Sequence, residues 1–181
     1  MDSLSRTWNR ALMPLILVGG GSRSGKSIFA LELARQRGAR RAFVATAQAF
    51  DNEMRERIAH HRAERDASFA TIEEPLDLAR TLHENAALFD VIVVDCLTLW
   101  VSNLLVSEQR EIETLGAELV QVAAESSALC IFVTNEVGSG IVPENALARK
   151  FRDLAGRLNQ QAARSAGEVY LLTFGIASRL K

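Results

Sequence analysis

The feature that most constrains this chain is a glycine-rich segment, GGSRSGKS, at residues 20–27. It fits the pattern GxxxxGK[ST] at every required position. A compact apolar run at residues 15–18 precedes the segment, and an amphipathic helical pattern at residues 26–37 follows it. By average residue usage, a chance match in a chain of this length occurs on the order of one per cent of the time. The context therefore predicts a phosphate-binding loop between a strand and a helix.

Each required position of this loop has a chemical role. Gly20 and Gly25 let the backbone fold back so that successive N–H groups point at phosphate oxygens, and the following helix adds its dipole at the same place. The Lys26 ammonium can neutralise the β- and γ-phosphates, and the Ser27 hydroxyl can bind Mg²⁺. The alternative is a glycine-rich turn with an incidental lysine. The residues predicted to bind the nucleotide here are Gly20, Gly21, Ser22, Arg23, Ser24, Gly25, Lys26 and Ser27.

Short apolar runs alternate with longer helical patterns along the chain, which predicts an α/β fold. Such alternation is typical of a mostly parallel sheet with helices on both faces, a three-layer sandwich. Residues 1–13 are expected to form an N-terminal tail and residues 14–181 a single P-loop domain. We expect strands at residues 15–18, 42–45, 91–94, 129–134 and 169–173, and helices at 26–37, 52–65, 75–88, 97–106, 111–125 and 143–166.

The charge balance excludes some partners. Lys and Arg number 21 and Asp and Glu number 22, and a net charge of −1 gives no general attraction to nucleic acid or anionic membranes. No apolar run approaches the roughly 20 residues that span a bilayer, and the N-terminal stretch lacks the apolar core of a signal peptide. Cys96 and Cys130 lie in or beside apolar runs, which is typical of buried free thiols in a reducing compartment. We therefore expect a cytoplasmic protein.

A carboxylate follows the apolar run at residues 91–94. P-loop enzymes commonly hold the Mg²⁺ shell with such a group at the end of a neighbouring strand, so Asp95 and Ser27 are the expected metal-binding residues. The alternative role for Asp95 is to cap the helix that follows. The sequence around Asp95 does not fit the switch of a signalling GTPase, and residues 134–137 do not fit its guanine-binding motif. A compact kinase-like enzyme is the remaining interpretation.

Several longer blocks carry a more specific signal than the phosphate loop alone. The chain resembles the bifunctional adenosylcobinamide kinase/adenosylcobinamide-phosphate guanylyltransferase family of cobalamin biosynthesis. The similarity extends over nearly everything from residue 15 to the C-terminus. The matching blocks are residues 19–27 (GGGSRSGKS), residues 45–65 around the His60-His61 pair, residues 71–76 (TIEEPL), residues 93–105 (VVDCLTLWVSNLL) and residues 134–159 (TNEVGSGIVPENALARKFRDLAGRLN).

The resemblance implies a RecA-like sheet, a homo-oligomer (a trimer), and two reactions that use Mg²⁺ with ATP or GTP. The first phosphorylates adenosylcobinamide. The second moves GMP from GTP onto adenosylcobinamide phosphate through a guanylylated histidine, which by motif position is His60. His60 and Lys26 are thus the expected catalytic residues. The further nucleotide contacts that the resemblance implies are Ala45, Thr46, Ala47, His61, Arg62, Ala63, Glu64, Glu73 and Asp95.

Two other interpretations remain open on the residues alone. A P-loop kinase for another small metabolite would lack nucleotidyl transfer, and His60 would be dispensable. A regulatory or scaffold module would bind nucleotide without turnover. Taken by itself, a histidine on a charged helical segment is more often solvated than catalytic.

Overall fold

A seven-stranded sheet forms the centre of the computed structural model, which describes residues 14–48, 67–109 and 111–181. The strand order is β3-β2-β4-β5-β1-β6-β7. All neighbours pair in parallel except β6 and β7, which are antiparallel. The predicted mostly parallel α/β architecture is therefore confirmed. The strands are β1 (Leu15–Gly20), β2 (Arg41–Ala45), β3 (Phe69–Glu73), β4 (Val91–Asp95), β5 (Leu129–Asn135), β6 (Glu168–Thr173) and β7 (Ile176–Arg179).

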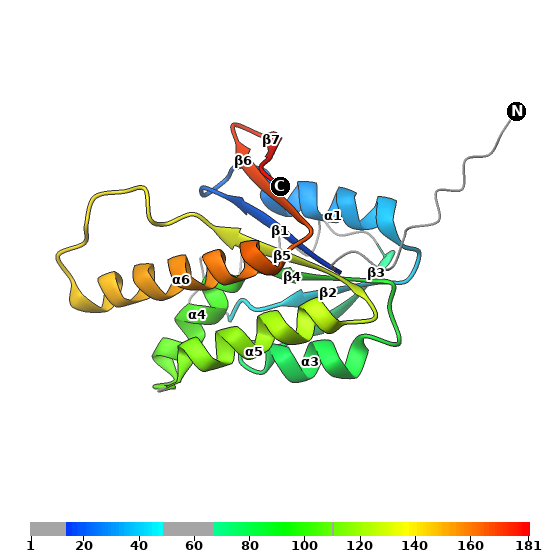
Figure 1. Ribbon diagram of the computed structural model, residues 1–181, viewed down its shortest axis with the longest axis horizontal. Helices are drawn as coiled ribbons and strands as arrows, with labels where there is room; N and C mark the ends of the chain where they lie inside the picture. Colours follow the sequence, from blue (N-terminus) through cyan, green and yellow to red (C-terminus); the bar gives the residue numbers. More distant parts are fainter. Residues whose placement is uncertain (1–13, 49–66, 110) are drawn as a thin grey trace, which may run out of the picture.

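Helices cover both faces of this sheet (Figure 1). Helix α1 packs on one face, and α3, α4, α5 and α6 pack on the other. Side chains of β1 alternate between the two cores: Leu15 and Leu17 point toward the four-helix side, and Ile16 and Val18 toward α1. Burial on both faces explains why the central strands are continuously apolar. The helices are α1 (Lys26–Arg37), α3 (Leu78–Asn85), α4 (Leu97–Val106), α5 (Ile112–Glu125) and α6 (Ala146–Ser165).

The structure contains two strands that the sequence did not predict, β3 and β7. Both lie at the edges of the sheet, and most of their side chains are exposed or half-buried. An edge strand therefore lacks the continuous apolar run that marked the central strands. The predicted helix at residues 52–65 lies outside the described residues.

Two predicted helices begin later than expected. We expected prolines at residues 75 and 143 to open them, but α3 begins at Leu78 and α6 at Ala146. In each case the residue before the helix is the N-cap. The Asp77 side chain accepts a hydrogen bond from the Arg80 N–H, and the Asn145 side chain accepts one from the Ala148 N–H. Capping side chains, rather than the preceding prolines, define these helix starts.

None of the described helices is both long enough and apolar enough to cross a membrane.

Both cysteines are buried and neither forms a disulfide, as the sequence predicted. Burial raises the pKa of the Cys96 thiol to about 11 and that of Cys130 to about 12. An unfolded thiol ionises near 9.0, so the stability associated with these protonated thiols is complete below about pH 9 and is lost as the pH rises through the folded pKa values. Between those limits the free energy of unfolding falls as the pH rises, because the unfolded thiol ionises and the folded thiol does not.

We therefore expect Cys130→Ala to weaken the pH dependence of unfolding above pH 9. Urea unfolding of the wild type and the variant at pH 8, 9 and 10 measures this, and the difference between them removes the contribution of other groups. A thiol reagent at pH 8 should label neither cysteine in the folded protein and both in urea. Rapid labelling without urea would contradict the buried placement.

Candidate nucleotide-binding site

The glycine-rich segment forms a loop between β1 and α1, as its motif predicted. Gly20 is the last residue of β1 and Lys26 the first of α1. Gly25 precedes the helix with a φ of 89°, a left-handed conformation that side-chain-bearing residues rarely adopt. Because Gly25 has no side chain to cap α1, the helix N-terminus is open for an anion to bind.

Two side chains of the loop suit a phosphate group. Lys26 is only 8% exposed, and its Nζ donates to the Gly21 carbonyl at 2.9 Å. The ammonium therefore lies over the loop. The Ser24 hydroxyl is buried and has no hydrogen-bond partner among the described residues. Leaving such a group unsatisfied costs about 1–3 kcal/mol. A phosphate oxygen is an acceptor that would satisfy it.

Gly20 is closely packed against its neighbours, and substituting it would test the conformation of the loop. A Cβ added there would lie 2.5 Å from Ser24 Oγ and 2.7 Å from the Leu172 carbonyl oxygen, whereas one added at Gly21 would meet no atom within 4 Å. We expect Gly20→Ala to weaken Mg-ATP binding by about tenfold or more, because the overpacked loop must move. Gly156→Ala in α6, where an added Cβ would also meet no atom within 4 Å, is the matched control and should stay within about twofold. Isothermal titration calorimetry measures the affinity of each variant for Mg-ATP. Equal affinities would contradict the close packing around Gly20.

The carboxyl ends of the central strands lie side by side next to this loop. In the strand register Gly20 pairs with Asn135, and Ala45 pairs with both Asp95 and Glu73. Ligands of open parallel sheets bind at this edge. The fold thus gathers Ala45, Glu73 and Asp95 at the edge that carries the loop. Their contacts with a nucleotide remain predictions.

Asp95 is not the cap of the helix that follows it. The N-cap of α4 is Cys96, without a side-chain cap hydrogen bond, so the alternative role considered for Asp95 is wrong. The Cys96 pKa is raised first by burial and then by the Asp95 carboxylate, and it is lowered by Lys26. Both charged groups therefore lie within electrostatic reach of the same sulfur. Val91 and Val93 of β4 lie in the core on the α1 side, so the alternation along the strand places Asp95 on that side as well.

The donor set at this edge fits magnesium. Mg²⁺ typically takes one or two protein oxygens, several waters and the phosphates of its nucleotide. Ser27 lies half-buried in the first turn of α1, and Asp95 ends the strand two positions away from β1 in the sheet. A hydroxyl and a carboxylate in these places can hold the ion against a triphosphate in the loop.

Thr46, one of the expected nucleotide contacts, joins β2 to β4. Its residue is fully buried, and its hydroxyl accepts from the Cys96 N–H at 2.8 Å and donates to the Cys96 carbonyl at 2.9 Å. Asn103 Nδ2 donates to the Thr46 carbonyl at 2.8 Å and to the Pro75 carbonyl at 3.1 Å. The hydroxyl of Thr46 therefore holds the ends of two strands in register.

The end of β5 is held by a second network that the sequence did not predict. Asn135 Nδ2 donates to Thr98 Oγ1 at 2.9 Å. Thr134 Oγ1 donates to Asn159 Oδ1 at 2.7 Å, and Asn159 Nδ2 donates to the Asn135 carbonyl at 3.3 Å. These bonds tie β5 to α4 and α6. Polar residues after an apolar strand were the available signal, but their partners are 24 to 37 positions away along the chain.

Six predicted nucleotide-site residues remain to be located, and only one of them lies among the described residues. Ala47 follows β2 at the same edge. The other five lie outside the described residues, so the catalytic role of His60 and the nucleotide contacts of its neighbours stay predictions. They are His60, His61, Arg62, Ala63 and Glu64.

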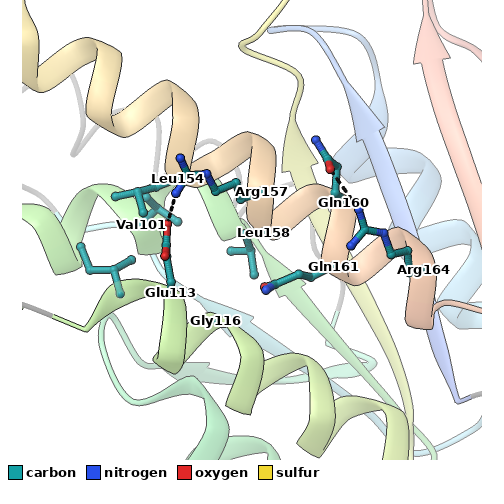
Figure 2. A pocket seen from close by; sticks show the side chains of 10 residues that line it. Val101, Glu113, Gly116, Leu154, Arg157, Leu158, Gln160, Gln161 and Arg164 are labelled. Carbon is teal, nitrogen blue, oxygen red and sulfur yellow. Dashed lines mark hydrogen bonds and ion pairs between the residues drawn. The ribbon is translucent and has the colours of Figure 1, made fainter.

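A cavity of about 190 Å³ lies elsewhere, between α5 and α6 (Figure 2). Its wall combines apolar side chains such as Leu158 with Arg164, and Glu113 and Arg157, which also line it, form an ion pair. This cavity lies among α4, α5 and α6, and no residue of the phosphate loop lines it. The phosphate loop has the motif, the Lys26 ammonium and the unsatisfied Ser24 hydroxyl, so the loop is the candidate nucleotide site.

Solved structures with a similar fold include the RadB recombinase, with a TM-score of 0.53 and 18% identity over 88% of this chain and 74% of that one. Another is an ATPase of the bacterial type III secretion system, with a TM-score of 0.57 and 13% identity over 92% of this chain and 57% of that one. At these identities the likeness concerns the fold alone. It agrees with the mostly parallel sheet covered by helices on both faces.

Sequence relatives are much closer. The bifunctional adenosylcobalamin biosynthesis protein CobP of Pseudomonas aeruginosa is 42% identical over 166 residues, 91% of this chain and 96% of that protein. The protein CobU of Escherichia coli, with the same bifunctional description, is 39% identical over 92% of this chain and 99% of its own length. The family model described as cobinamide kinase / cobinamide phosphate guanyltransferase matches residues 16–180. This chain therefore belongs to the cobinamide kinase / cobinamide phosphate guanyltransferase family.

Proposed function

We propose that this protein phosphorylates adenosylcobinamide with ATP or GTP and then transfers GMP from GTP to the product. The observation that carries the proposal is the family match over residues 16–180, combined with an intact phosphate loop at residues 20–27. The final products are adenosylcobinamide-GDP and pyrophosphate. Residues 14–181 would form the catalytic domain, and a homotrimer in the cytoplasm is our proposal for the working form.

In the kinase step the substrate hydroxyl oxygen bonds to the γ-phosphorus, and the bond from that phosphorus to the β-phosphate oxygen breaks. The nucleoside diphosphate leaves, and the hydroxyl proton passes to solvent or a base. Lys26 and the loop N–H groups stabilise the negative charge that shifts onto the phosphate oxygens. Magnesium, held by Ser27 and Asp95 when bound, would neutralise the β- and γ-phosphates.

In the second step a neutral imidazole nitrogen of His60 attacks the α-phosphorus of GTP, and pyrophosphate leaves. An ordinary imidazole has a pKa near 6.5, so about three quarters of it is neutral and nucleophilic at pH 7. The phosphoramidate then passes GMP to a phosphate oxygen of adenosylcobinamide phosphate, which restores the histidine. The two reactions differ in which phosphorus of the bound triphosphate is attacked.

Covalent labelling tests this proposal. Purified protein is incubated with Mg²⁺ and GTP labelled at the α-phosphate, and the denatured protein is examined for label. We expect label that is labile in acid and stable in alkali, the behaviour of a phosphoramidate. Absence of label despite measurable GTP binding would remove the guanylyl transfer, and the enzyme would then be a kinase for a small metabolite.

A further inference from the structure

The turn between β6 and β7 presents an aromatic ring to solvent. Phe174 is 95% exposed, the most exposed position together with Ile141 among the large apolar residues that the structure describes. Its φ is 55°, and the next residue, Gly175, has a φ of 80°. A non-glycine residue in this conformation is uncommon, and the folded state must stabilise it. The turn thus presents an apolar ring to solvent.

This turn is bound to the phosphate loop. The Gly175 N–H donates to the Ser24 carbonyl at 3.1 Å. A Cβ placed on Gly25 would lie 3.5 Å from the Gly175 Cα, so the two backbones are in contact there. Phe174 is therefore next to a residue that touches the loop directly. These backbone contacts fix the turn relative to the phosphate loop.

The strand order gives the bound triphosphate a direction. β1 lies between β5 and β6, and Asp95 ends β4, on the far side of β5. If Asp95 and Ser27 hold the metal at the β- and γ-phosphates, the γ-phosphate points toward β4. In the kinase step the α-phosphate and nucleoside of the donor would then extend the opposite way across β1, whereas the guanine of the guanylyl transfer is expected near Glu73. The opposite side of β1 is the one on which β6, β7 and Phe174 lie.

We propose that Phe174 is the stacking platform for the purine base of the phosphoryl donor, an inference that rests on the proposed binding of a triphosphate in the loop. Base–aromatic stacking tolerates any base because every base has a π-face. This matches a kinase step that accepts either ATP or GTP. Glu73, which the family resemblance links to the guanine nucleotide, ends β3 at the opposite edge of the sheet. Phe174 therefore serves the base of the γ-phosphoryl donor.

The experiment compares two ligands that share phosphates but differ in the base. Titration calorimetry measures Mg²⁺-bound ATP and Mg²⁺-bound inorganic tripolyphosphate against the wild type, Phe174→Ala and Phe174→Trp. Leu88→Ala, which removes another exposed apolar side chain (59% exposed), is the matched control. We expect Phe174→Ala to weaken ATP about tenfold and to leave tripolyphosphate unchanged. Phe174→Trp should retain ATP affinity, and ATP but not tripolyphosphate should quench its added fluorescence.

Three results would overturn the proposal. Equal weakening of both ligands by Phe174→Ala would mean that the turn only shapes the phosphate loop. Unchanged ATP affinity, with a change in sedimentation of Phe174→Ala, would assign the ring to a contact between copies of this chain, together with the exposed Ile176 of β7. Failure of the wild type to bind either ligand would instead refute the triphosphate site itself. Only the first two outcomes leave the proposed function intact.

Discussion

Lys26→Met is expected to abolish both the phosphorylation of adenosylcobinamide and the guanylylation of the protein. The substitution keeps an apolar side chain of similar length in a position that is only 8% exposed, but removes the cation that lies over the loop. Both reactions need the triphosphate held there, so we expect kcat/KM to fall at least on the order of 10²- to 10³-fold in each. Initial rates with each substrate, and label from α-labelled GTP, measure the two losses.

Lys150→Met is the matched control, because Lys150 is an exposed residue of α6 and its charge lies outside the site. It should leave both activities within about twofold. Thermal unfolding of the Lys26 variant confirms that its fold is intact. If one activity survived in Lys26→Met while the other was lost, the two reactions would not share one triphosphate site, and our assignment of the loop to both would be wrong.

His60→Ala is expected to separate the two reactions. Covalent label from α-labelled GTP should disappear, because the nucleophilic nitrogen is gone. Phosphorylation of adenosylcobinamide by ATP should continue, since the γ-phosphoryl transfer uses the loop and the metal. Chromatography of the corrinoid product distinguishes the outcomes: the variant should accumulate adenosylcobinamide phosphate and form no adenosylcobinamide-GDP.

His83→Ala provides a control for the loss of a histidine, since His83 is an exposed residue of α3 that our mechanism does not use. It should label like the wild type. His61→Ala addresses the choice within the histidine pair. Label that persists in His60→Ala and disappears in His61→Ala would move the nucleophile by one residue and leave the mechanism otherwise the same.

Local chemistry in the sequence accounts for the parts of the site that were predicted correctly. The phosphate loop was readable because its function needs two glycines, a lysine and a hydroxyl at set spacing within eight residues. The central strand β4 was readable because burial on both faces requires an unbroken apolar run. Asp95 was then found by its place after that run. The signals are all contained in short segments.

The edge strands and the helix starts were missed for a related reason. In β3 and β7 few side chains enter the core, so hydrogen bonding to a neighbour, which has no sequence period, determines their conformation. Asn145 begins α6 through one side-chain hydrogen bond, while the more conspicuous proline at residue 143 does not. The proline and the asparagine are both typical of helix starts, and the sequence alone does not show which of them begins the helix.

The sequence by itself determined that this chain has a phosphate loop, an α/β alternation and the motifs of its family. Only the tertiary structure decided which segments lie around that loop. Sheet order places the ends of β4 and β2 on one side and the β6–β7 turn on the other. It brings Gly175, the neighbour of Phe174, into contact with Ser24 near the start of the chain. Such neighbours depend on long-range strand pairing and on shared burial in two cores. Neither the pairing partner of a strand nor the core that it shares can be predicted from the hydrophobic pattern of that strand alone.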